Sequence, residues 1–154
     1  SRSHRYVGKE VKNVRENVGI IELANFSKHE FVGLDAKKFL DKILAGYIPK
    51  KGRINLNPML TNKGKLYGDL TIGCIDNNYF LVFGSGTAQE MHRRWFEDNL
   101  SGFDVEYKNQ SDYLHGLAIA GPKSRKVIQK LFCNTQINCI KLHYTNENNL
   151  FSVF

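Results

Sequence analysis

Apolar residues recur along this chain with two periods, one typical of helices and one typical of strands. Apolar residues spaced three and four positions apart predict helices. These cover residues 9–18, residues 36–44, a segment that begins at the turn 84–87 and ends at residue 100, and residues 123–132. Short apolar runs between turn residues predict strands, over residues 20–23, 29–32, 53–60, 65–75, 79–83, 103–107 and 114–119. Weaker strand patterns lie at residues 137–142 and 150–154.

Turn and cap residues mark several of these boundaries. Asp35 is expected to be a helix N-cap and Gly46 to stop the same helix. Pro58 lies inside a predicted strand and has no backbone N–H, so this strand should be an edge strand or carry a bulge. The segment 62–64, Asn-Lys-Gly, predicts a turn with its glycine at a positive φ.

The helical spacing also predicts which side chains face the core. In the helix that ends near residue 100, the expected apolar face consists of Met91, Trp95, Phe96 and Leu100. In the last predicted helix it consists of Val127, Ile128 and Leu131.

The order of elements predicts an α+β fold with mostly antiparallel sheet and inserted helices. Several strands are joined by turns that are too short for a parallel crossover. The 154 residues suffice for a hydrophobic core, and neither repeats nor a low-complexity linker divide them. We therefore expect residues 1–154 to form one domain. The chain stops on an apolar run, so we expect the domain to continue beyond residue 154.

Composition narrows the class of protein. No apolar run approaches the roughly 20 residues of a membrane-spanning helix, and the first residues do not resemble a signal peptide. The three cysteines have no CxxC spacing, which favours free thiols in a reducing compartment. The formal net charge of +7 would attract an anionic partner, such as nucleic acid, a lipid surface or a polyanionic ligand. The basic residues are spread along the chain, which favours a solvated basic surface.

Most common catalytic signatures are missing from the sequence. The five histidines are scattered, without the spacing of a metal site, and no GxSxG elbow predicts a nucleophile. The segment 84–86, Gly-Ser-Gly, precedes a helix but lacks the rest of a phosphate-binding motif, so a plain strand-to-helix turn is favoured. No metal is expected.

Asp69 is the one candidate for chemistry. It is an acid in an otherwise largely apolar strand, and a carboxylate buried there would need a partner. Either it is a capping or salt-bridged aspartate, or it holds or deprotonates an amine in a pocket. Gly68 beside it would let a planar ligand approach the backbone.

Four sequence blocks resemble the folate-binding region of the glycine-cleavage T-protein family, above all its branch in dimethylglycine and sarcosine dehydrogenases. The blocks begin at Val7 and end near Leu131. The more specific ones read GRINLNPMLTNKGKLYGDLTI and GSGTAQEMHRRWFEDNL, and GLAIAGPKSRKVIQKL supports the wider superfamily. The resemblance implies the N-terminal part of the T-protein fold.

The resemblance also implies a function. Asp69 matches the hairpin aspartate that faces folate in that family, and would be the catalytic residue and part of the cofactor site. Leu56, Leu66 and Gly68 would complete the contacts with tetrahydrofolate. The implied reaction is capture of an iminium or aminomethyl carbon from a methylated glycine, of dimethylglycine or sarcosine type, to give methylenetetrahydrofolate.

The departures from the family pattern are informative. The T-protein usually has a tyrosine near position 56 and a second acid beside the aspartate, where this chain has Leu56 and Gly68. That difference favours the dehydrogenase branch. The later family segment that closes the pterin pocket is missing, and so is a flavin-binding GxGxxG region. We therefore expect little activity from the chain alone, and a flavoprotein domain of a parent chain as a partner. A cytoplasmic location, or the mitochondrial matrix in a eukaryote, is expected.

Two alternatives stay open. In the first, the chain is a superfamily relative with other chemistry, such as a folate-dependent demethylase or an iron–sulfur assembly factor. In the second, it is a basic nucleic-acid-binding module. The last would show strongly salt-dependent binding. Its aromatic residues lie mostly in apolar runs and not among exposed basic residues, which argues against it.

Overall fold

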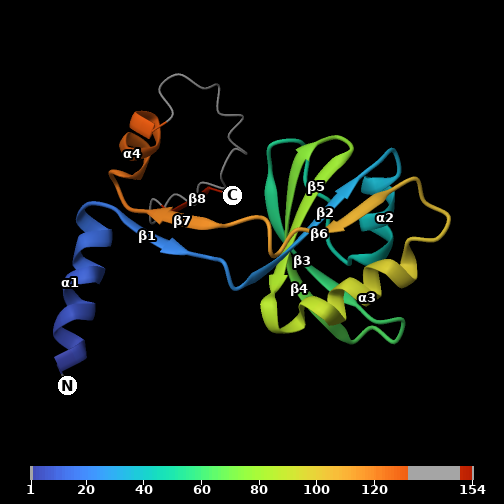
Figure 1. The fold of residues 1–154 in the computed structure, drawn as a ribbon, viewed down its shortest axis with the longest axis horizontal. Helices are drawn as coiled ribbons and strands as arrows, with labels where there is room; N and C mark the ends of the chain where they lie inside the picture. Colours follow the sequence, from blue (N-terminus) through green and yellow to red (C-terminus); the bar gives the residue numbers. More distant parts are fainter. Residues whose placement is uncertain (1, 132–149, 154) are drawn as a thin grey trace. The chain divides into compact units, whose positions relative to one another are not determined.

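A computed structural model describes residues 2–131 and 150–153 of the chain. The chain divides into two compact units, Ala24–His115 and a second unit made of Ser1–Leu23 with Gly116–Phe154 (Figure 1). The expectation that residues 1–154 act as one domain stays a prediction.

The unit that contains both chain ends is built on a three-stranded antiparallel sheet. The strand order is β1-β7-β8, and Ile20 pairs with Ile119. Its elements are helix α1 (Arg2–Glu16), β1 (Gly19–Glu22), β7 (Leu117–Ala120), helix α4 (Ser124–Leu131) and β8 (Leu150–Val153). The predicted terminal strand is therefore confirmed as β8. The strand predicted at residues 137–142 lies outside the described residues.

The unit Ala24–His115 contains a five-stranded sheet in the order β3-β4-β5-β2-β6, and every neighbouring pair is antiparallel. Its strands are β2 (Phe26–Val32), β3 (Ile54–Leu60), β4 (Leu66–Asp76), β5 (Tyr79–Ser85) and β6 (Glu106–Asn109). Its helices are α2 (Ala36–Ile43), the short 3-10 helix η1 (Gly86–Ala88) and α3 (Gln89–Asn99). The predicted α+β class with antiparallel sheet and inserted helices is confirmed. The strand with Pro58 is an edge strand, as its missing N–H requires.

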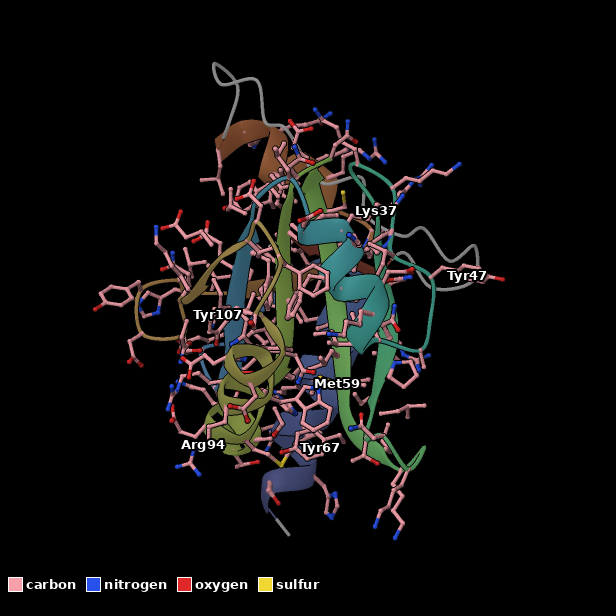
Figure 2. The ribbon with its side chains drawn as sticks, turned by 90° about the vertical axis from the view of Figure 1, so that its right-hand side faces the viewer. Lys37, Tyr47, Met59, Tyr67, Arg94 and Tyr107 are labelled. Carbon is pink, nitrogen blue, oxygen red and sulfur yellow. The ribbon has the colours of Figure 1, made fainter. Side chains whose placement is uncertain are left out.

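The core lies between one face of this sheet and the two helices α2 and α3, which are on the near side of the strands in Figure 2. Alternating residues of the strands point into it because neighbouring side chains of a strand face opposite ways. The buried core consists of Phe31, Ala36, Phe39, Leu40, Ile43, Leu44, Met59, Leu70, Ile72, Cys74, Phe80, Val82 and Phe96. The opposite face of the sheet, which we call the open face, carries the other alternate residues.

Two details of the helices differ from the sequence-based expectations. Asp35 is the residue before α2, but its carboxylate does not cap the helix; it accepts a hydrogen bond from the backbone N–H of Asp104 at 3.1 Å. In α3 the buried residues are His92 and Phe96, whereas Met91 is 39% exposed. Trp95 and Leu100 also pack against the core, so three of the four predicted residues are confirmed, and the inward face includes His92 in place of Met91. In α4, Leu131 is exposed and not inward.

No helix among residues 2–131 is long and apolar enough to span a membrane.

Candidate functional site

The hairpin of β3 and β4 carries all four predicted site residues. Its tip forms as expected: Gly64 has a φ of 71°, and its N–H donates to the carbonyl of Thr61 at 2.8 Å. The N–H of Thr61 in turn donates to the carbonyl of Lys65 at 2.8 Å. This closed tip fixes how the two strands are aligned.

The alignment puts Asp69 directly opposite Pro58, on the open face of the sheet. Its neighbours Gly68 and Leu70 are buried on the core face, while Asp69 itself is exposed. The carboxylate is therefore not buried, and the cost of burying a charge does not arise.

A β-bulge near the tip decides which residue accompanies Asp69. The register shifts between Met59 and Leu60, so Leu60 pairs with Leu66 and not with Tyr67. Residues that pair across a ladder point to the same face. Leu66 thus shares the open face with Asp69, and Tyr67 stays on the core side, where its ring packs against that of Trp95.

The open face of the hairpin is largely apolar around Asp69. Leu56 and Leu66 are each 66% exposed, and Pro58 lies between them along the pairs of the ladder. Leu56 pairs with Thr71, which is two residues beyond Asp69 and brings a hydroxyl to the same face. The structure thus brings Asp69, Leu56 and Leu66 together on one face, and it adds Thr71 and Pro58, which sequence reasoning did not select.

Gly68 has a different position from the other three site residues. It is buried, and a Cβ atom at this position would lie 2.7 Å from Nε2 of His92 on the core side. The space that the glycine leaves free is therefore used by a side chain of the protein. A role of Gly68 in contacting a ligand stays a prediction, and it would have to involve its backbone.

A polar cluster lies on the core side of the sheet, where β2, β6 and α3 meet. Nδ1 of His29 and the hydroxyl of Tyr107 are 2.8 Å apart, and the rings of His29 and His92 are 6.3 Å apart. Burial, together with the nearby His92, lowers the pKa of His29 to about 4. Burial also lowers the pKa of His92, against the opposing effect of a backbone contact with Tyr67. Both imidazoles are therefore neutral at pH 7.

No sequence pattern indicates this pair, because 63 positions separate the two histidines (92 − 29). Only the packing of α3 on β2 brings them together. Within the described part of the chain, no group of three or more His, Cys, Asp or Glu residues is arranged to hold a metal ion.

The next strands extend the open face with a buried lysine. Thr71 of β4 pairs with Phe83 of β5, and Phe83 pairs with Lys28 of β2. Lys28 is almost fully buried, and its ammonium donates to the carbonyls of Phe26 at 2.7 Å and Ala24 at 3.2 Å. Its aliphatic stem is thus covered while its charge is satisfied by backbone oxygens. The sequence did not single out this lysine.

Comparison with known sequences agrees with this architecture. The family described as "GCVT N-terminal domain" matches residues 1–151. Human mitochondrial dimethylglycine dehydrogenase is 41% identical over 128 residues, which are 81% of this chain and 15% of that protein. An aminomethyltransferase of Desulfitobacterium hafniense strain DSM 10664 / DCB-2 is 26% identical over 144 residues, which are 91% of this chain and 39% of that protein. The chain thus spans well under half the length of both relatives.

A solved structure shares the fold. The glycine cleavage system aminomethyltransferase T from Bartonella henselae superimposes with a TM-score of 0.70 at 19% identity, over 79% of this chain and 34% of that one. At this identity the likeness concerns the fold alone.

Proposed function

Because the chain belongs to the GCVT N-terminal domain family, we propose that it is a tetrahydrofolate-binding one-carbon transfer domain that acts through Asp69. The donor is a methylated glycine of the dimethylglycine or sarcosine type, and the product is methylenetetrahydrofolate. The names of the two relatives, dimethylglycine dehydrogenase and aminomethyltransferase, support this class of reaction.

The observation that carries the proposal is the isolated carboxylate of Asp69 on an exposed, largely apolar surface. A folate combines a flat ring system with an amine, so it needs an apolar platform beside a hydrogen-bond acceptor or base. Leu56 and Leu66 offer the platform, and Asp69 offers the acceptor from the same face. The residues present therefore fit the ligand.

Asp69 and the two leucines would have different roles toward bound tetrahydrofolate. Tetrahydrofolate, when bound, supplies the amine that captures the one-carbon unit. Asp69 would orient that amine by accepting its hydrogen bond, and would hold the proton that capture releases. Leu56 and Leu66 would keep the ring in place and exclude water from one side, which limits hydrolysis of the iminium to formaldehyde.

Direct binding tests the folate site. Tetrahydrofolate is titrated calorimetrically into the wild-type chain and into Asp69→Asn. Loss of a hydrogen bond to a charged group costs about 1.5–3 kcal/mol, so the affinity of the variant should fall about 10- to 150-fold. Asp98→Asn is the matched control because it makes the same change at an exposed position of α3, on the helix side of the sheet.

The leucines give a second, independent reading of the same site. Leu56→Ala and Leu66→Ala should each weaken binding by about tenfold, since each removes apolar area that the ligand would cover. If wild type binds tetrahydrofolate and none of the three site substitutions weakens that binding, the site lies elsewhere on the chain. The absence of any binding by wild type would contradict the proposal that these residues hold folate.

The transfer step is tested with a donor supplied in trans. A separate flavoprotein oxidises dimethylglycine in the presence of tetrahydrofolate and this chain, and free formaldehyde and methylenetetrahydrofolate are both quantified. Wild type should raise the folate product at the expense of formaldehyde, and Asp69→Asn should lose most of that effect. Equal product ratios with and without wild type would limit the chain to binding.

A further inference from the structure

The ring of His92 fills the space beneath the strand that carries Asp69. A Cβ atom built on Gly68 of β4 would lie 2.7 Å from Nε2 of this ring, and one built on Gly84 of β5 would lie 3.0 Å from its Nδ1. Contacts this short leave no room for a methyl group. Two neighbouring strands therefore lack side chains at the two points where the ring touches them.

The ring has little freedom to move away. His92 is 2% exposed and lies in the middle of α3, with Phe96 one turn further along the helix. The ring of His29 lies on its other side, at a centroid distance of 6.3 Å with the planes near perpendicular. Protein interiors are close-packed, so a ring enclosed in this way acts as a fixed support.

Support under Gly68 is transmitted to Asp69 by the geometry of a strand. Neighbouring side chains in a strand point to opposite faces. Gly68, which contacts the ring on the core side, is therefore followed directly by Asp69 on the open face. A shift or rotation of the backbone at Gly68 would therefore redirect the carboxylate. Misplacement of a reacting group by about 1 Å can cost on the order of 100-fold in rate.

We propose that His92 is a positioning residue for the folate site: its ring, packed against Gly68 and Gly84, fixes the backbone that aims Asp69 at the ligand. This inference rests on the proposed folate function. His92 itself faces the core and does not touch the ligand.

The sharpest test pairs the histidine with the glycine it supports. Gly68→Ala adds the methyl group that collides with the ring, and His92→Ala removes the ring; each alone should weaken tetrahydrofolate binding by about tenfold or more. In the double variant the methyl group enters the space left by the ring, so binding should be no weaker than in either single variant. Such non-additivity is the signature of a direct contact.

A second cycle asks whether His92 acts through the acid. His92→Gln keeps a polar side chain but not the flat ring, and should weaken binding in the wild-type background by about tenfold. In an Asp69→Asn background the same change should have an effect of less than about twofold, because there is no carboxylate left to aim. His92→Gln also serves if His92→Ala fails to fold.

The unfolding free energy of each variant is measured as well, to distinguish a loss of positioning from a general loss of stability. Ile43→Val trims a buried side chain of α2, outside the hairpin, and should cost stability without changing the folate affinity. The positioning role would be overturned if Ile43→Val, compared at equal stability, lost as much folate affinity as the His92 variants lose.

The outcomes distinguish this inference from the proposed function. No binding by wild type contradicts the folate function, and the role of His92 with it. Binding by wild type that His92→Gln leaves unchanged, or strictly additive effects in both cycles, overturns the role of His92 and leaves the folate function standing.

Discussion

The ring centroids of Tyr67 and Trp95 lie 4.7 Å apart with their planes tilted by 38°, and this contact ties the β3–β4 hairpin to helix α3. Tyr67 directly precedes Gly68, and Trp95 is one helical turn after His92. The hairpin and α3 are therefore joined at two consecutive strand positions, by the aromatic pair and by the glycine–histidine contact, on the core side of the sheet (Figure 2, where Tyr67 is labelled).

The contact between these rings should be measurable as a coupling energy. Substituting Tyr67 and Trp95 by leucine, singly and together, should give an interaction free energy of about 0.5–1.5 kcal/mol, the usual size for an aromatic pair. Urea unfolding followed by far-UV circular dichroism measures it, since the chain has a single tryptophan and loses it in the variant. Tyr47→Leu, at a tyrosine that is 92% exposed, is the control and should change stability by less than about 0.5 kcal/mol. Strictly additive losses would show that the two rings do not support each other.

Asn57 should be far more important for stability than its polar character suggests. It is fully buried on the edge strand; its Oδ1 accepts from the N–H of Gly46 at 2.6 Å and its Nδ2 donates to the carbonyl of Tyr47 at 3.1 Å. Asn57→Ala leaves the N–H of Gly46 without its acceptor, while the carbonyl of Tyr47 still accepts from Asn55, and should cost about 1–3 kcal/mol in unfolding free energy. Asn62→Ala, at an exposed residue of the hairpin tip, should cost much less. Equal losses would mean that water replaces the amide easily.

The stability of the chain should fall as the pH falls from about 6.5 to about 4. The folded state holds His29 neutral down to a pKa of about 4, whereas in the unfolded state it takes up a proton near its usual value of 6.5. Since the unfolded state binds more protons in this window, acid favours unfolding, by up to about 3 kcal/mol from this residue. The lowered pKa of His92 acts in the same direction.

Urea titrations at several pH values check this expectation. His29→Gln should flatten the dependence of the unfolding free energy on pH, although it also removes the contact with the Tyr107 hydroxyl. The change His4→Gln, on an exposed residue of α1, should leave the slope as in wild type. If the unfolding free energy of His29→Gln depends on pH as steeply as that of wild type, other groups take up the proton.

Asp69 should be dispensable for folding even though we assign it the central role in function. Its carboxylate is exposed, so Asp69→Ala should change the unfolding free energy by less than about 0.5 kcal/mol. Thermal unfolding monitored by circular dichroism gives the comparison with wild type. A loss of several kcal/mol would instead indicate that the carboxylate serves the fold, the structural alternative that the sequence left open.

The sequence by itself determined the elements of this protein, their antiparallel order and the hairpin that carries Asp69. It could do so because these features depend on neighbouring residues: apolar spacing, a proline that lacks a donor, and the Asn-Lys-Gly tip with Gly64 at positive φ. The family also followed from local blocks of sequence, and the match over residues 1–151 confirms it.

Only the tertiary structure decided how the hairpin is oriented and supported. The bulge beside Leu60 put Leu66 on the open face with Asp69, and the packing of α3 turned His92, and not Met91, toward the sheet. Neither could be foreseen, because a single inserted residue reverses the facing of a strand, and what packs against a helix decides which residue at the border of its apolar stripe turns inward. The contact of His92 with Gly68 joins segments 24 positions apart (92 − 68), and only the folded chain brings such segments together.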